Sequence, residues 1–117
     1  MSTGLTVTVQ EQDDRLVVLC LTGALDYDTS AILLEQATAT MRTPHHLVLD
    51  MSGITFCDSS GLNTLLRLNR HTQAGHTALT LVAVPGQLRR LLRITGTDTV
   101  LTLRDNLAEA RAAHDRT

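Results

Sequence analysis

Two stretches near the start of the chain have the hydrophobic patterns of β-strands. Leu5, Val7 and Val9 alternate with polar residues, which is the period of a strand with one buried face. The run from Leu16 to Leu21 is apolar throughout, as expected for a strand covered on both faces. Because the link between them, from Glu11 to Asp14, is short and polar, we expect an antiparallel hairpin.

A helical pattern follows the hairpin. Asp26 or Asp28 can cap a helix that runs to about Arg42. The apolar face of this helix consists of Leu33, Leu34, Ala37 and Met41. Ile32 falls outside that face and is expected at the surface. Leu47 to Asp50 then predicts a third strand, which should be parallel to the second because a helix connects the two.

The next helix comes after the polar turn Asp58-Ser59-Ser60-Gly61. Apolar residues at helical spacing predict a helix from about Ser60 to Thr72, with its end at Gly75. Its expected buried stripe comprises Leu62, Leu65, Leu66 and Asn69. Leu68 lies outside this stripe, so we expect it to contact a partner rather than the core.

The last third of the chain predicts two more strands and two more helices. These are a strand over Ala78 to Val84, a helix with Leu88, Leu91 and Leu92 on its buried side, a strand over Val100 to Leu103, and a final helix. Asn106, with Glu109 three residues later, has the pattern of a capping box for that last helix. The order β-β-α-β-α-β-α-β-α indicates one α/β domain over residues 1–117, with an ordered core over about 4–114.

Composition narrows the class of function. A chain of 117 residues with 43% hydrophobic and 19% charged residues is typical of one globular domain. No stretch has the roughly 20 apolar residues of a membrane span, and the start lacks a signal-peptide pattern, so we expect a cytoplasmic protein. A net charge of -2 and 2% aromatic residues argue against nucleic acid and an anionic membrane surface as partners.

The motifs of common enzyme and metal sites are missing from the sequence. The chain has no lysine, which excludes a Walker-type phosphate loop and Schiff-base chemistry. Gly-x-Ser-x-Gly does not occur around Ser59, and the five histidines lack metal-ligand spacing. Cys20 and Cys57 are expected to be reduced thiols. We therefore expect no catalytic residues, no cofactor and no metal, and we interpret the outward-facing cluster of Arg89, Arg90 and Arg93 as a solvated face.

The turn at Asp58 to Gly61 has two interpretations. The side-chain oxygens of Asp58, Ser59 and Ser60 can cap the following helix, and this composition is common in turns. Gly61 lets the backbone turn tightly, which leaves the hydroxyls open to another molecule. Asp26 and Asp58 approach each other if both follow parallel strands at the same sheet edge, where ligand sites of α/β folds gather. On the residues alone, the plain helix cap is favoured and a functional site stays open.

Several segments resemble the STAS family of bacterial anti-sigma factor antagonists. The matching blocks are Leu21-Thr22-Gly23-Ala24-Leu25-Asp26 with Thr29, Leu47-Val48-Leu49-Asp50, Asp58-Ser59-Ser60-Gly61-Leu62, and Leu91 to Gly96. The resemblance covers nearly the whole chain. It implies a single STAS domain, with a mixed sheet and helices packed mainly on one face.

The resemblance also implies a switch at Ser59. In that family, the anti-sigma factor is a serine kinase of the GHKL type that phosphorylates the serine after the aspartate. The unmodified antagonist binds the anti-sigma factor and releases a sigma factor, whereas the phosphorylated form cannot bind until a PP2C-type phosphatase restores it. The residues expected to contact the partner are Asp26, Asp58, Ser60, Gly61, Leu62 and Leu68.

A second function is compatible with the same family. Some STAS domains serve as scaffold subunits of transport or signalling complexes. The intact Asp58-Ser59-Ser60 sequence favours the antagonist, because a scaffold needs no acceptor serine. The chain departs from the family pattern at Ala24, where many members have glutamate, and at Cys57, where a larger apolar residue is frequent.

Overall fold

The sheet begins with the predicted antiparallel hairpin. In a computed structural model that describes residues 4–40 and 46–115, β1 (Leu5–Gln12) pairs antiparallel with β2 (Leu16–Leu25). Asp13 holds the turn, because its Oδ1 accepts hydrogen bonds from the N–H groups of Arg15 at 2.8 Å and Leu16 at 2.9 Å. Val9 is 46% exposed instead of buried, although its register partner Leu19 is fully buried, and a register shift follows Val9.

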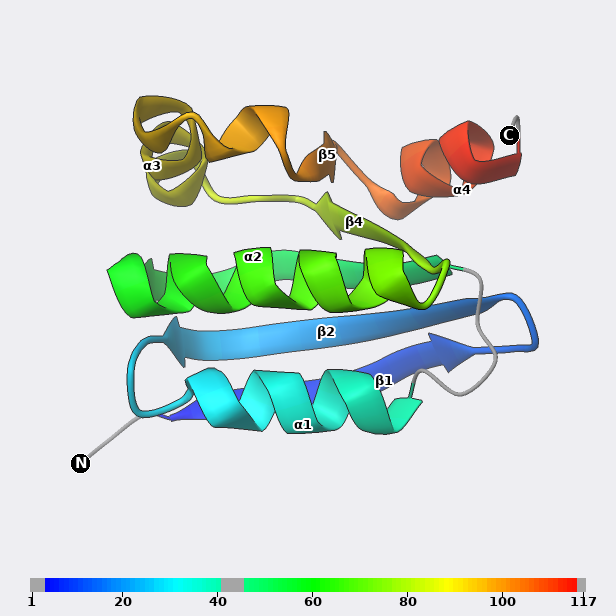
Figure 1. Cartoon of the computed structure of the whole chain (residues 1–117), viewed down its shortest axis with the longest axis horizontal. Helices are drawn as coiled ribbons and strands as arrows, with labels where there is room; N and C mark the ends of the chain where they lie inside the picture. Colours follow the sequence, from blue (N-terminus) through cyan, green and yellow to red (C-terminus); the bar gives the residue numbers. More distant parts are fainter. Residues whose placement is uncertain (1–3, 41–45, 116–117) are drawn as a thin grey trace.

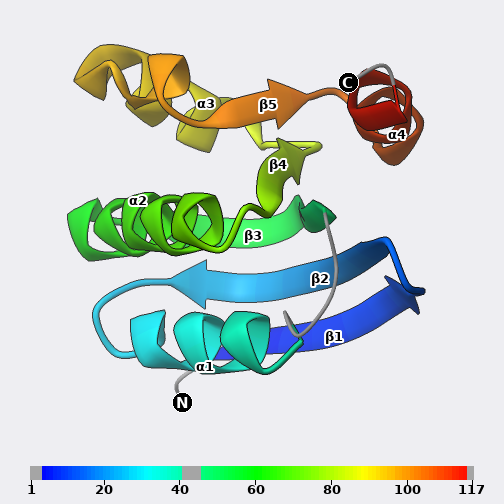
Figure 2. The same ribbon diagram turned by 45° about the vertical axis from the view of Figure 1, so that its right-hand side comes forward.

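The rest of the chain alternates helices with parallel strands (Figure 1). The elements are α1 (Ser30–Thr40), β3 (His46–Cys57), α2 (Ser59–Ala74), β4 (Ala78–Val82), α3 (Gly86–Thr95), the 3-10 turn η1 (Thr97–Thr99), β5 (Thr102–Arg104) and α4 (Leu107–Asp115). The strands lie in the order β1-β2-β3-β4-β5, and β2 to β5 are mutually parallel (Figure 2). The predicted α/β class, the element order and the parallel pairing of β2 with β3 are confirmed.

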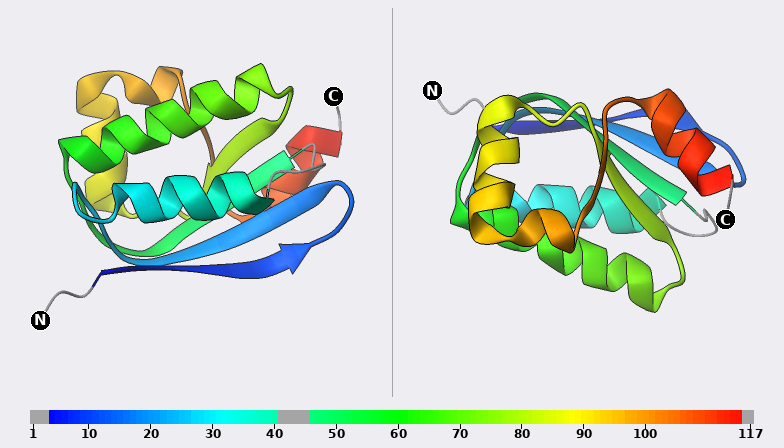
Figure 3. Two further views of the ribbon diagram at one scale, coloured as in Figure 1. Left: turned by 60° about the horizontal axis from the view of Figure 1, so that its bottom comes forward. Right: turned by 90° about the horizontal axis from the view of Figure 1, so that it is seen from above.

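Most of the core lies on one face of the sheet. Leucines of α1, α2 and α3 pack there against the inward side chains of the strands, with Leu33, Leu65 and Leu92 each 0% exposed. A smaller cluster on the opposite face joins Val18 and Val48 to Ala110 of α4. Figure 3 shows α1 and α2 side by side on one face and α4 on the other. The expectation that the helices pack mainly on one face is therefore confirmed.

The third strand is longer than its apolar run predicts. β3 does not stop at Asp50 but continues to Cys57, because it stays paired with β2 through two register shifts. The hydrophobic pattern does not reveal this extension, because it is interrupted by Ser52, Gly53 and Thr55. Because of this extension, β3 ends level with β2, and Asp58 follows at the carboxyl ends of the two parallel strands.

Other boundaries shift by a few residues. β4 ends at Val82 instead of Val84, because Ala83 has a φ of 54°, which no strand residue adopts. Val100 is 55% exposed and follows the 3-10 turn, so β5 begins only at Thr102. Ile32 is 38% exposed, as expected, whereas Met41 and Arg42 lie outside the described residues.

Candidate functional site

Two aspartates lie next to each other along one edge of the sheet, where β2 and β3 end. The parallel register pairs Leu25 of β2 with Cys57 of β3, and Asp26 and Asp58 are the residues that follow this pair. Both strands end at the same side of the sheet, and α1 and α2 both start there (Figure 1). This is the arrangement in which the two carboxylates were expected to share a sheet edge.

Asp58 caps α2 and leaves Ser59 at the surface. Its backbone is extended, its Oδ1 accepts a hydrogen bond from the N–H of Gly61 at 2.9 Å, and its carbonyl accepts one from the N–H of Leu62 at 2.9 Å. Ser59 is the first residue of the helix and is exposed, and no hydrogen bond in the described part of the chain uses its hydroxyl. The cap and the open hydroxyl therefore coexist.

Gly61 is required by the close contact between α2 and the end of β2. A Cβ at this position would lie 2.2 Å from the carbonyl oxygen of Leu25 and 2.9 Å from Sγ of Cys57. No side chain can approach a backbone oxygen so closely, so only glycine fits. Gly61 thus brings the start of α2, and with it Ser59, against the end of β2.

The turn before α1 is held by Asp26. Its Oδ1 accepts hydrogen bonds from the N–H groups of Asp28 at 3.0 Å and Thr29 at 3.1 Å. The Thr29 hydroxyl is buried, donates to the carbonyl of Ala24 at 2.8 Å and accepts from the N–H of Asp26 at 2.9 Å. Of the two possible caps suggested by the sequence, Asp26 is thus the one whose carboxylate bonds the turn that leads into α1.

Three residues expected at the partner surface lie beneath it. Leu68 is 0% exposed, so the prediction that it points away from the core is wrong. Its burial follows from the wide apolar face of α2, which packs on β3 and β4 and also against α1. Gly61 is buried and Leu62 is 7% exposed. These three residues therefore offer a partner almost no surface, whereas Asp26, Asp58 and Ser60 are each partly exposed.

The chain has one tyrosine and one phenylalanine, and both are exposed at this edge of the sheet. Tyr27 is 80% exposed and follows Asp26, while Phe56 is 55% exposed and precedes the Asp58 turn by two residues. Phe56 also lines a groove of about 240 Å³, whose walls include Pro85 and Leu91. Exposed aromatic residues are enriched where proteins bind other proteins. Sequence analysis did not identify either aromatic as a site residue.

Cys57 is a poor nucleophile. Burial, and secondarily the negative charge of Asp58, raises the pKa of its thiol from 9.0 to about 11. The thiol is therefore protonated at neutral pH, and it lies 3.6 Å from the carbonyl oxygen of Asp58 as a weak donor.

Within residues 4–40 and 46–113, no three His, Cys, Asp or Glu side chains form a group that could hold a metal ion. In the same ranges, no helix is long and apolar enough to cross a membrane.

The chain is similar to a known domain family and to solved structures. The family model of the STAS domain matches residues 7–110. An anti-sigma factor antagonist from Mycobacterium paratuberculosis is 30% identical, with a TM-score of 0.75, over 93% of this chain and 92% of that one.

Two less similar structures share the fold. A putative anti-sigma factor antagonist from Thermotoga maritima is 17% identical over 93% of this chain and 92% of that one, with a TM-score of 0.80. The murine Solute Carrier 26 family member A9, an anion transporter, is 16% identical over 97% of this chain and only 22% of that one, with a TM-score of 0.82. The same fold therefore occurs in small antagonists and within a much larger transporter.

Proposed function

The chain belongs to the STAS domain family, and on this premise we propose that it is an anti-sigma factor antagonist whose binding is switched off by phosphorylation of Ser59. The observation that carries the proposal is the exposed Ser59 hydroxyl at the first position of α2, directly after the capping Asp58. The Mycobacterium paratuberculosis antagonist, at 30% identity over nearly the full length of both chains, supports the same function. The protein acts as a binding partner and not as an enzyme.

The surface around Ser59 is suited to protein docking. Tyr27 and Phe56 provide exposed aromatic area near the ends of β2 and β3. The partly exposed residues Asp26, Asp58 and Ser60 of the same turns provide polar groups. Aromatic side chains combined with polar groups that can form hydrogen bonds are typical of protein interfaces. We assign this surface to the anti-sigma factor, a serine kinase of the GHKL type, whose capture in the cytoplasm releases a sigma factor.

A phosphate on Ser59 would make this surface much more negative. It adds a charge of about -1.5 to -2 next to Asp58 and near Asp26, where no described arginine forms an ion pair. The added charge and its hydration oppose docking. The phosphate also faces the unpaired N–H groups at the start of α2, which favour an anion, so the fold survives modification. A PP2C-type phosphatase would then restore binding.

Incubation of the protein with candidate GHKL kinases and labelled ATP tests the acceptor. We expect one phosphate per chain in the native protein and none in Ser59→Ala, while the matched variant Ser60→Ala is labelled normally. Label retained by Ser59→Ala would show that the acceptor lies elsewhere. Binding of the kinase is measured in parallel by calorimetry, and we expect Ser59→Asp to weaken it at least tenfold relative to Ser59→Asn.

A scaffold role in a transport complex is the alternative function. It is favoured by the likeness of this fold to a domain of the murine anion transporter, although at 16% identity that likeness shows the fold alone. A scaffold requires neither an exposed serine nor a change of affinity on phosphorylation. Equal kinase binding by Ser59→Asp and Ser59→Asn would therefore favour the scaffold.

A further inference from the structure

A cavity of about 270 Å³ lies at the end of the sheet opposite Ser59, where β3 and β4 begin. Its lining includes His46, the first residue of β3, together with Asn69 and Gln73 from the second half of α2. Asn69 follows Ser59 by ten residues of α2, which is about 15 Å along the helix axis. The cavity is therefore separate from the surface that we assign to the anti-sigma factor.

The floor of this cavity is polar although it is buried. Of the six polar residues that are buried in the described part of the chain, three line the cavity: His46 at 1% exposed, Thr80 at 5% and Asn69 at 6%. Nε2 of His46 lies within hydrogen-bond distance of the Thr80 hydroxyl, at 2.8 Å. A hydroxyl has one donor site and two acceptor sites, so Thr80 keeps an acceptor site for a further bond. Because buried polar groups cost free energy unless they form hydrogen bonds, the floor indicates an occupant that is polar, either water or a ligand.

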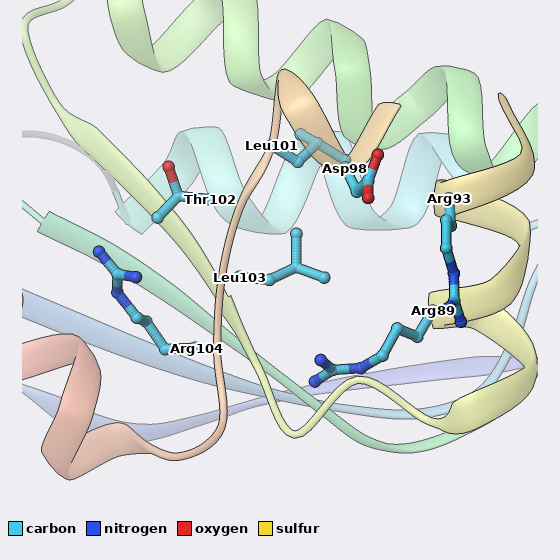
Figure 4. Close-up of a pocket in the computed structure, with 7 residues that line it drawn as sticks. All are labelled: Arg89, Arg93, Asp98, Leu101, Thr102, Leu103 and Arg104. Atoms are coloured by element: carbon cyan, nitrogen blue, oxygen red, sulfur yellow. The ribbon is translucent and has the colours of Figure 1, made fainter. Parts of the chain in front are cut away.

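One cation lies at the rim of the cavity. Thr102 and Arg104 of β5 line it, and Figure 4 shows both side chains on the side of β5 that faces away from Arg89 and Arg93. This agrees with the alternation of a strand, in which residues two apart share a face. Arg104 forms no ion pair with any residue of the described ranges, and no Asp or Glu is among the residues that line the cavity. The guanidinium group of Arg104 is therefore available to one anionic group of a ligand.

We propose that this cavity binds a small monocarboxylate that also carries hydroxyl groups. The guanidinium group of Arg104 matches one carboxylate, which it can bind through two parallel hydrogen bonds. The amide of Asn69 and the hydroxyl of Thr80 lie deeper and suit hydroxyl groups, because each can both donate and accept hydrogen bonds. A volume of about 270 Å³ lies just below the usual range of sites for drug-sized molecules, so the ligand is small. This activity goes beyond the proposed function and does not depend on it.

Titration of the full chain with glycerate at matched ionic strength tests the proposal by amide NMR. Glycerate combines one carboxylate with two hydroxyl groups, so glycerol, which lacks the carboxylate, and propionate, which lacks the hydroxyls, test the two halves separately. We expect saturable shifts at His46, Asn69, Thr80 and residues 102–104. Glycerol and propionate should each bind with a Kd at least about tenfold higher than that of glycerate, because each lacks one set of hydrogen bonds. Propionate binding as tight as that of glycerate would overturn the proposal, and so would a lack of saturation, which would mean that the cavity holds water alone.

A pair of arginine variants locates the site. Arg104→Gln should raise the Kd for glycerate at least about fivefold, because it removes the charged donor for the carboxylate. Arg93→Gln is the matched control, since it removes the same charge from the other side of β5 and should leave Kd within about twofold at physiological salt. Equal weakening by the two variants would overturn the proposal. Tighter binding of orthophosphate than of glycerate would also overturn it, in favour of a general attraction of anions.

A third variant tests the polar floor. Asn69→Leu keeps the size of the side chain and should remove most of the preference for glycerate over propionate, and an amide spectrum with native dispersion verifies that the variant is folded. An unchanged preference in the folded variant would contradict the role of Asn69. If this buried substitution prevents folding, the arginine pair and the ligand series still decide the outcome. Because Ser59→Ala should bind glycerate normally, the result is independent of the antagonist function.

Discussion

The two turns that lead from a parallel strand into a helix use the same capping residue but differ in the residues after it. After β2, Oδ1 of Asp26 accepts a hydrogen bond from the N–H of Thr29, and after β3, Oδ1 of Asp58 accepts one from the N–H of Gly61. In each turn the aspartate therefore bonds the amide three residues later, as a helix cap does. The residue three positions after the aspartate is the buried Thr29 in the first turn and Gly61 in the second.

The hydroxyl groups of the two turns have opposite roles. The Thr29 hydroxyl bonds both the carbonyl of Ala24 and the N–H of Asp26, so the fold itself uses it. The Ser59 hydroxyl is exposed, and the α2 cap is complete without it. Only the second turn thus has a hydroxyl that can be modified without disturbing the structure. Substitutions in each turn can test this division between a structural turn and a functional one.

The largest effect on stability is expected at Gly61. In Gly61→Ala the new Cβ would lie 2.2 Å from the backbone oxygen of Leu25, and backbone cannot move aside cheaply. Overpacking of this kind costs about 3 kcal/mol of unfolding free energy, measured by urea denaturation. Gly86→Ala is the control, because its Cβ would meet nothing within 4 Å, and it should not destabilise the protein. Equal stability of the two variants would contradict the close contact.

Removal of the Thr29 hydroxyl is expected to cost less. Thr29→Val keeps the volume but leaves the N–H of Asp26 and the carbonyl of Ala24 without this partner in a buried position. The cost is about 2 kcal/mol, whereas the matching change in the other turn, Ser59→Ala, should stay within about 0.5 kcal/mol. Urea denaturation of both variants measures the difference. A destabilisation by Ser59→Ala as large as that of Thr29→Val would remove the distinction between the turns.

The sequence was sufficient to predict the architecture and the position of Asp58 at the start of a helix. Apolar periodicity predicted the hairpin, the parallel β2–β3 pair and the element order, because these depend on patterns within each segment. The family resemblance based on Asp58 to Leu62 is confirmed by the family model over residues 7–110. The role of Ser59 as phosphate acceptor stays a prediction.

The features that sequence patterns missed depend on contacts between segments. The sequence pattern predicts one narrow apolar face on α2, which leaves Leu68 outside the core. In the structure, the sheet and α1 together bury a wider face of α2 that includes Leu68. Phe56 comes two residues after the buried Ile54 and would share its face in a regular strand. The register shift between them, where Ile54 pairs with Gly23 but Phe56 pairs with the next residue Ala24, turns Phe56 away from the core, and it is 55% exposed. A cavity of about 490 Å³ lies between α3 and β5 and is lined by Arg93 and Arg104, which come from these two separate elements. No local pattern contains this information.

Loss of either aspartate cap is expected to have a smaller effect than the loss of the Thr29 hydroxyl. Asp58→Ala removes the bond to the N–H of Gly61 and should cost about 1 kcal/mol, the usual value of a helix cap. Asp26→Ala should cost somewhat more, because Oδ1 of Asp26 accepts from two amides, the N–H groups of Asp28 and Thr29. Thermal or urea unfolding measures both. The reverse order would mean that the two caps are not built as the hydrogen bonds indicate.

The last effect depends on pH and concerns Cys57, whose counterpart in the register is the apolar Leu25. Burial, and then the charge of Asp58, raises the pKa of the Cys57 thiol from 9.0 to about 11, so the folded protein holds this proton more tightly than the unfolded chain does. The resulting stability is fully present below pH 9.0 and is lost as the pH rises towards about 11. Cys57→Ala lacks this titration, so the stability difference between native protein and variant should shrink over that interval in urea denaturation. A difference that stays constant from pH 8 to 11 would show that Cys57 ionises as freely in the folded turn as in the unfolded chain, and that the end of β3 is more open to water than its burial implies.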